Sequence, residues 1–193
     1  MEMAERILNT YNYIDYTSFP DEMKCEIIDG EVYMMSPARS FIHQTVSLNI
    51  ASSFSNQLKG KRCKPAIVPL NVFLDYCGEI NDCRVIIQPD VIVVCDQNKI
   101  DKRGILGIPN LTVEVISPSS IIKDTRINSE LFERFKVPEY WLVFPELQTI
   151  VVSFLENDKY KSISYIYEKG MELSIQSKSV SELLRDLSVI FVA

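Results

Sequence analysis

Two acidic residues interrupt β-branched apolar runs, and this pattern constrains the fold more than any other feature of the chain. Asp90 precedes Val-Ile-Val-Val, and Glu114 lies within Leu-Thr-Val-Glu-Val-Ile. Such runs predict buried strands, in which a bare carboxylate is costly unless it is neutralised, pairs with a cation or binds a metal. A single acid would more simply mark a strand end that faces solvent. Because there are two, the pattern favours neighbouring strands that share a metal site.

Length and composition predict one domain. With 193 residues, 47% of them hydrophobic, residues 1–193 can bury one core and are too few for two full domains. No apolar stretch approaches the roughly 20 residues of a membrane-spanning helix. The first six residues lack the basic and then apolar pattern of a signal peptide. We therefore expect a cytoplasmic protein that does not enter a membrane.

The five cysteines are odd in number and form no CxxC pair, which argues against a zinc knuckle and a full disulfide framework. We expect mostly reduced thiols, with Cys25 and Cys95 packed in strands. The formal charge of −6 argues against a protein that coats nucleic acid through its overall field. A basic run at residues 59–64 fits the end of a helix, and a local nucleic-acid patch is the alternative.

The spacing of apolar residues predicts helices that flank a strand-rich centre. Apolar side chains recur every four residues from Ile42 to Leu58, which predicts a helix over residues 41–58. The Asp29-Gly30 pair predicts a β-hairpin, and a second helix over residues 126–136 ends before Pro138. Further strands are expected at residues 66–74, 90–95, 111–116, 140–144, 149–154, 162–167 and 172–175, with a short helix at 181–185. These elements predict an α+β fold with a mixed sheet.

Several segments of the chain together resemble the Uma-two family of restriction-endonuclease-like (PD-(D/E)XK) nucleases. They are Glu26-Ile-Ile-Asp-Gly-Glu31, Met35-Ser-Pro, His43, Pro89-Asp90-Val-Ile-Val-Val, Glu114-Val-Ile-Ser-Pro-Ser119, Asp124 and Val137-Pro-Glu-Tyr-Trp141-Leu-Val. The resemblance covers residues 26–145. It implies a restriction-endonuclease-like fold, an α/β mixed central β-sheet flanked by helices, with a Mg²⁺ site at the splayed edge of the sheet and DNA as the partner.

By position, Asp90 resembles the family's metal-bridging aspartate, Glu114 its second metal carboxylate and Glu26 the upstream acid that completes the site. Hard divalent cations take oxygen ligands, so Mg²⁺ suits these residue types and Mn²⁺ can substitute for it. Such a cation activates water for attack on phosphorus. The resemblance therefore implies a divalent-metal-dependent endonuclease that hydrolyses DNA phosphodiester bonds.

The chain departs from the family where the catalytic lysine belongs. The wider superfamily carries a lysine two residues after the second acid, where this chain has Ile116. The Uma-two family carries one in the following helix, where this chain has Asn128. Asparagine supplies no positive charge, and loss of such a group costs on the order of 10²-fold or more in rate. Lys123 and Arg126 lie within one turn of Asn128 and are the candidates for a shifted cation; each could equally be a solvated charge.

The remaining candidates have structural alternatives. His43, the only histidine, stands at a helix start, where a capping or packing role competes with a functional one. Glu31 is the fallback for the third acid should Glu26 point away. Tyr140 and Trp141 follow the alternation of a core strand, which predicts a packing role.

Two functions follow from these residues. The first is a Mg²⁺-dependent endonuclease that uses Glu26, Asp90 and Glu114, with Lys123 or Arg126 as the cation. The alternative is a catalytically weakened nuclease-fold protein that acts as a binding or interaction module. The retained acids favour the nuclease, since replacing strand carboxylates with apolar residues would stabilise a fold that no longer needed them. A homodimer is compatible with either function.

Overall fold

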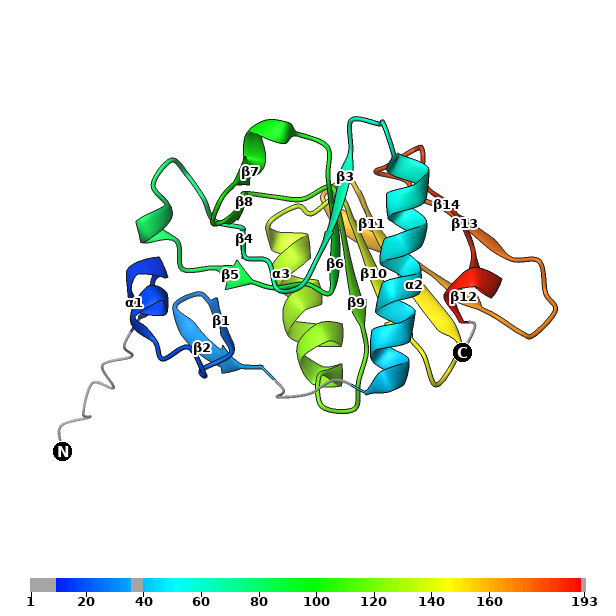
Figure 1. Ribbon diagram of the computed structural model, residues 1–193, viewed down its shortest axis with the longest axis horizontal. Coiled ribbons are helices and arrows are strands. Elements are labelled where there is room, and N and C mark those ends of the chain that lie inside the picture. The colour runs from blue at the N-terminus through cyan, green and yellow to red at the C-terminus, as the bar shows by residue number, and fades with distance from the viewer. Residues whose placement is uncertain (1–9, 36–39, 192–193) are drawn as a thin grey trace.

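The computed structural model describes residues 10–35 and 40–191 and contains two six-stranded sheets (Figure 1). The main sheet has the order β12-β11-β10-β9-β6-β3; β9 and β10 run parallel and the other neighbours antiparallel. Its strands are β3 (Lys64–Ile67), β6 (Val91–Val94), β9 (Leu111–Val115), β10 (Glu139–Phe144), β11 (Thr149–Glu156) and β12 (Lys159–Ile166). This arrangement confirms the expected α+β fold with a mixed sheet.

The second sheet has the order β2-β1-β5-β4-β8-β7 and lies beside one end of the main sheet (Figure 1). Its strands are β1 (Cys25–Ile28), β2 (Glu31–Met34), β4 (Val72–Phe73), β5 (Ile86–Ile87), β7 (Ile100–Asp101) and β8 (Gly104–Leu106). A small hairpin of β13 (Ser174–Gln176) and β14 (Leu184–Asp186) precedes α4 (Leu187–Ile190). Short helical turns η1 (Ile80–Asp82) and η2 (Gln97–Lys99) and helix α1 (Tyr13–Ser18) complete the periphery.

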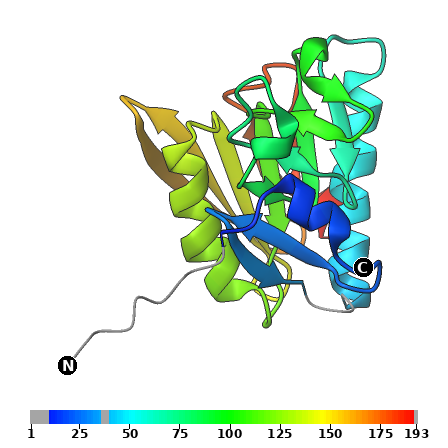
Figure 2. The ribbon, with the colours of Figure 1, turned by 90° about the vertical axis from the view of Figure 1, so that its left-hand side faces the viewer.

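Two helical segments cover opposite faces of the main sheet (Figure 2). Helix α2 (Phe41–Leu58) has the predicted bounds and begins at the cap Ser40. It buries the predicted stripe apart from its first residue, Ile42, which is half-buried, and Phe54 of the stripe packs edge-to-face on Trp141. On the other face, the π-helix η3 (Lys123–Asn128) continues into α3 (Ser129–Arg134). There Phe132 packs against Tyr140 with ring centroids 4.7 Å apart. The expected packing role of Tyr140 and Trp141 is thus confirmed, because both rings are fully buried.

The predicted hairpin is also confirmed. Ile28 of β1 pairs with Glu31 of β2, and the connecting Asp29 and Gly30 have φ values of 55° and 82°. A two-residue turn of this type needs positive φ at both positions, which aspartate tolerates and glycine adopts freely. The turn fixes the register of β1 and therefore the direction in which Glu26 points.

Other boundaries were wrong. The helical segment expected at residues 126–136 begins before them, with η3 at Lys123. The strand expected at residues 66–74 is divided into β3 and β4, consistent with Pro69, which cannot donate to a ladder. The helix expected at residues 181–185 is replaced there by β14, which pairs with β13, and α4 begins only at Leu187 after the cap Asp186.

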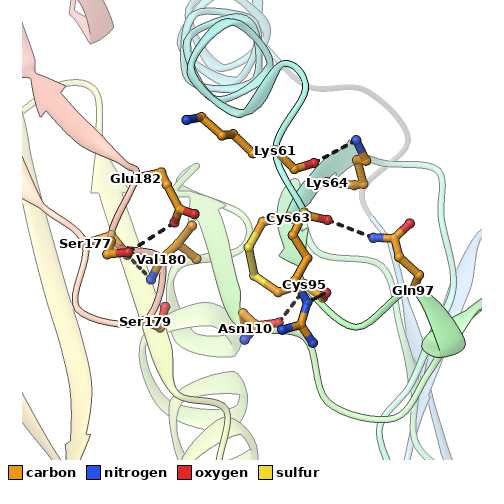
Figure 3. Close-up of a disulfide and its surroundings, with 12 residues drawn as sticks. Lys61, Cys63, Lys64, Cys95, Gln97, Asn110, Ser177, Ser179, Val180 and Glu182 are labelled. Atoms are coloured by element: carbon orange, nitrogen blue, oxygen red, sulfur yellow. Dashed lines mark hydrogen bonds between the residues drawn. A yellow bond between two sulfur atoms is a disulfide. The ribbon is translucent and has the colours of Figure 1, made fainter.

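The cysteine prediction is confirmed for Cys25, a free thiol buried in β1, but needs a correction for Cys95. Cys63 and Cys95 form a disulfide (Figure 3). Strands β3 and β6 are antiparallel with Lys64 opposite Val94, so one further step brings the two cysteines face to face. Cys25, Cys77 and Cys83 are free thiols. The pairing depends on the register of two strands that lie far apart in sequence, which the spacing of cysteines alone does not reveal.

A buried carboxylate anchors the C-terminal region to the main sheet. Glu139 of β10 is fully buried. Its Oε2 accepts hydrogen bonds from the hydroxyl groups of Ser177 and Ser179 and from the backbone amides of Lys178 and Ser179, at 2.7–2.9 Å. Its Oε1 accepts one from Trp141 Nε1 at 2.7 Å. These donors satisfy the charge locally, as a buried carboxylate requires.

Within the described ranges, no helix has the length and apolar character needed to cross a membrane. The N-terminal residues 1–6 and the Ser36-Pro37 pair of the family pattern lie outside the described residues.

Candidate metal and active site

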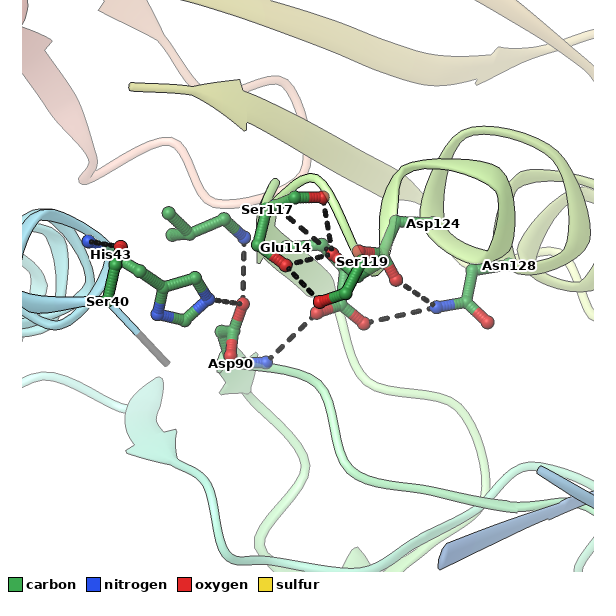
Figure 4. Close-up of polar contacts among 10 residues, drawn as sticks. Ser40, His43, Asp90, Glu114, Ser117, Ser119, Asp124 and Asn128 are labelled. Carbon is green, nitrogen blue, oxygen red and sulfur yellow. Dashed lines mark hydrogen bonds and ion pairs between the residues drawn. The ribbon is translucent and has the colours of Figure 1, made fainter. Parts of the chain in front are cut away.

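Asp90 and Glu114 lie next to each other at one end of the main sheet (Figure 4). Val91 pairs with Val113 in the β6–β9 ladder, so the next step places Asp90 opposite Glu114. The Asp90 carboxylate accepts a hydrogen bond from Val115 N at 2.8 Å, and Glu114 Oε2 accepts one from Asp90 N at 3.4 Å. Each residue is only 4% exposed. The structure therefore brings the two predicted acids together in a buried position.

Glu26 reaches the same region from β1, and Lys123 meets it there from η3. Glu26 is buried, its Oε1 accepts from Gln88 N at 2.7 Å, and its Oε2 forms an ion pair with Lys123 Nζ. Burial lowers the pKa of Lys123, but the carboxylates of Glu26 and Glu114 raise that pKa by more, so the net shift is upward. Lys123 is therefore held in its charged form beside the acids.

Asn128 and Asp124 extend the cluster along η3. Asn128 Nδ2 donates to Glu114 Oε1 at 3.3 Å and to Asp124 Oδ1 at 3.2 Å, and both residues are buried (Figure 4). Tyr140 OH donates to the backbone oxygen of Asp124 at 2.9 Å, which ties this turn to β10. A π-turn within a helix is rare and occurs often at functional sites. Here the wider turn carries Lys123, Asp124 and Asn128 towards Glu114.

His43 approaches Asp90 from α2, on the other side of the pair (Figure 4). The ring is buried, and its Nε2 lies 3.2 Å from Asp90 Oδ2. This separation is that of an ion pair, although the ring N–H does not point at the oxygen with hydrogen-bond geometry, and Nδ1 also has no hydrogen-bond partner among the described residues. The default expectation for His43, capping or packing alone, therefore misses a contact with the acid cluster. Its position depends on how α2 docks on β6.

Two sequence candidates lie away from the cluster. The Arg126 side chain is 78% exposed and lies 3.7 Å from the exposed Glu130, so the structure does not bring it to the acids. Glu31 is exposed and accepts from Tyr33 OH, so Glu26 and not Glu31 is the third acid of the cluster. Between the two cations considered, the structure places Lys123 at the acids.

The cluster holds more negative than positive charge. Its carboxyl groups belong to Glu26, Asp90, Glu114 and Asp124, and its only lysine within the described residues is Lys123. Burial, followed by the charges of Asp124 and Asp90, raises the pKa of Glu114 well above its usual range; Lys123 lowers this pKa and Glu26 raises it again. Without a further cation, Glu114 therefore favours its protonated form.

The residues fit a hard divalent cation by donor type and charge. Among the described residues, no three His, Cys, Asp or Glu side chains form a ready-made metal cluster. Protein donors occupy Asp90 Oδ2 and both Glu114 oxygens. The carboxylates nevertheless supply the oxygen ligands that Mg²⁺ takes, and their excess charge requires compensation. Asn128 Oδ1 is also buried without a hydrogen-bond donor in the described part of the chain. Exchange of the present donors for a cation would satisfy these groups.

Comparisons with known proteins agree with this geometry. Residues 10–187 match the family Uma2, described as "Putative restriction endonuclease". The chain belongs to this family. The uncharacterized protein slr1290 of Synechocystis sp. is 25% identical over 158 residues, which cover 82% of this chain and 80% of that protein. A crystal structure described as "a putative nuclease belonging to DUF820" from Anabaena variabilis superposes with a TM-score of 0.70 at 17% identity, covering 94% and 97% of the two chains. That likeness establishes the restriction-endonuclease-like fold of this Uma2 protein.

The raised pKa of Glu114 predicts a pH-dependent stability of the metal-free protein. The carboxyl group is neutral in both states below its ordinary pKa of 4.5, and above that value the unfolded chain loses the proton more readily than the folded one. The free energy of unfolding should therefore fall as pH rises from about 4.5 towards the raised folded-state pKa. Glu114→Gln, which cannot ionise, should lack this contribution.

Urea unfolding in a chelator between pH 4.5 and 8 measures the effect. The advantage of Glu114→Gln over the parent should grow with pH, whereas Glu168→Gln, an exposed glutamate outside the cluster, should follow the parent. A difference between Glu114→Gln and the parent that stays constant over this range would contradict the assignment.

Proposed function

We propose that this Uma2 protein is a divalent-metal-dependent endonuclease that hydrolyses phosphodiester bonds in DNA. The observation that carries the proposal is the buried cluster of Glu26, Asp90 and Glu114 with Lys123 at the end of the main sheet. Together with Asp124, these are four buried carboxyl groups beside one lysine, an arrangement that costs stability and therefore indicates a function. Family membership supports nuclease chemistry as that function.

In this proposal Asp90 and Glu114 hold Mg²⁺, or Mn²⁺ in its place, with Glu26 as the third carboxylate. When bound, the cation supplies charge to the phosphate and activates water. Hydrolysis forms one bond from a water oxygen to phosphorus and breaks one bond from phosphorus to a bridging oxygen. The attacking water loses a proton and the leaving oxygen gains one. The chain's residues must orient the phosphate and stabilise the negative charge that develops on it.

Lys123 is the residue proposed for that charge. Its Nζ pairs with Glu26, and its pKa is raised, so the ammonium group is present at neutral pH. Asn128, in the family's lysine position, instead donates its amide to Glu114 and Asp124. We assign Lys123 to the electrostatic role, and we assign Asn128 to holding the Glu114 side chain until a cation takes the place of its amide. His43, 3.2 Å from Asp90, is assigned to holding the Asp90 carboxylate.

Metal binding should stabilise the folded protein. Mg²⁺ or Mn²⁺ bound to the folded site raises the melting temperature by mass action, because the unfolded chain has no assembled site. At 100 times the dissociation constant, the gain in the free energy of unfolding is about 2.7 kcal/mol. The double variant Asp90→Asn with Glu114→Gln should lose this shift, as differential scanning fluorimetry can measure. A control with Glu168→Gln and Glu172→Gln, two exposed acids, should keep it. If the site variant shows the same metal-induced shift in melting temperature as the parent, Asp90 and Glu114 are not the metal ligands.

The shifted lysine predicts a rescue. Lys123→Ala should lower metal-dependent DNA cleavage by about 10²-fold or more, the usual cost of one group that stabilises the transition state. Adding Asn128→Lys to Lys123→Ala should restore part of the rate, because the new ammonium group starts from the helix position at which the family carries its lysine. Steady-state cleavage of DNA in Mg²⁺ and Mn²⁺ measures both changes.

Lys161→Ala is the matched control, since this exposed lysine lies on β12 and pairs with Glu156. Full activity in Lys123→Ala would contradict the assignment of Lys123 to the electrostatic role. If neither the parent nor Asn128→Lys cleaves any DNA in either metal, the binding-module function becomes the better explanation.

A further inference from the structure

A groove of about 620 Å³ lies between the β1–β2 hairpin and the η3–α3 segment. Both ribbon views place the hairpin beside α3 (Figures 1 and 2). Ile28 and Tyr33 line it from the hairpin, and Ile122, Ile127 and Leu131 line it from the helical side. The volume is within the range of small-molecule sites, roughly 300–1,000 Å³.

The residues that line the groove are neighbours of the acid cluster. Tyr33 is the register partner of Glu26, and residues that pair across two strands project from the same face of the hairpin. Ile28 follows Glu26 by two positions and shares this face as well. On the helical side, Ile122 precedes Lys123, and Ile127 follows it by about one turn. A DNA strand with one phosphate at Lys123 would therefore place the adjacent nucleotide at the groove.

The charges of the groove disfavour a phosphate in it. Its charged residues are two arginines, Arg126 and Arg134, and three acids, Asp29, Glu31 and Glu130. Arg134 is already engaged, because it forms two hydrogen bonds with Asp29 at 2.9 and 2.7 Å. This balance contrasts with the clustered cations that bind a nucleic-acid backbone. A neutral, flat group suits the groove better.

The groove offers such a group an aromatic ring and apolar contacts. Tyr33 is half-buried, and burial, followed by the Glu31 charge, raises the pKa of its phenol, so the ring is neutral. Ile122 is 71% exposed despite its size. A nucleobase is flat and uncharged and stacks on aromatic rings, but in a paired duplex it is covered by its neighbours and its partner. Only an unpaired base can enter.

We propose that the groove binds an unpaired nucleobase adjacent to the phosphate that is cleaved, so that the substrate is single-stranded DNA or DNA with an unpaired nucleotide at the cut. The proposal rests on the proposed function for the position of the phosphate. Tyr33 stacks on the base, Ile122 covers it, and the acid cluster acts on the neighbouring phosphodiester.

Binding and cleavage test the proposal separately. Binding of a fluorescent single-stranded oligonucleotide is measured by anisotropy in Ca²⁺, a hard cation that takes oxygen ligands as Mg²⁺ does. Cleavage of the same oligonucleotide, of its blunt duplex and of a duplex with one unpaired nucleotide is measured in Mg²⁺. The single strand and the unpaired site should be cut faster than the blunt duplex.

Tyr33→Ala should weaken single-strand binding by about 5- to 100-fold, as expected from the loss of one base stack. Tyr33→Phe, which keeps the aromatic ring, should bind as tightly as the parent. Ile122→Ser is the second variant, since so exposed a side chain contributes little to folding, and it should weaken binding in the same direction. Ile166→Ser is its matched control: this isoleucine is 61% exposed and lies on β12, the far edge strand of the main sheet.

The outcomes distinguish this proposal from the nuclease function. Cleavage that is fastest on the blunt duplex and unaffected by Tyr33→Ala and Ile122→Ser would overturn the groove proposal and leave the nuclease intact. Single-strand binding that depends on Tyr33 without any cleavage would support the groove and contradict the nuclease. If the parent neither binds nor cleaves any of these oligonucleotides, both proposals fail.

Discussion

The burial of several carboxyl groups at one end of β6 and β9 is the constraint on which the rest of the site depends. Asp90 and Glu114 face each other at the end of a ladder whose other members, apart from Thr112, are apolar, so the surrounding core cannot solvate the two charges. The surrounding elements supply the compensation. η3 brings Lys123 and the Asn128 amide, and α2 brings His43, while β1 adds Glu26, which pairs with Lys123. The two sheets and both flanking helices therefore meet where the charge is concentrated.

Local sequence patterns predicted the parts of the fold that depend on neighbours in the chain. The four-residue spacing that ends at Leu58 specified α2 to the residue, and Asp29-Gly30 specified the hairpin because few pairs tolerate positive φ twice. The two acids predicted their own proximity, because each interrupts a buried strand. These signals all act over a few residues, and tertiary contacts reinforced them.

Features that depend on long-range strand register or on irregular helical turns could not be predicted from the sequence. The π-turn changes which side chains of η3 point inward, so Lys123 faces the acids while Arg126 faces solvent. The contact of His43 with Asp90 requires the docking of α2 on the sheet. The Cys63–Cys95 disulfide requires the β3–β6 register. The family resemblance was specific enough to indicate the nuclease fold. Because position 128 is an asparagine, however, the sequence left open whether Lys123 or Arg126 supplies the positive side chain.

The most direct test of the metal site is a crystal structure of the protein with Mn²⁺, measured at the manganese absorption edge. Our account predicts an anomalous peak bonded to oxygens of Asp90 and Glu114, with the Asn128 amide displaced from Glu114. Well-ordered crystals in saturating Mn²⁺ that show no peak there, with Asn128 still bonded to Glu114, would contradict it.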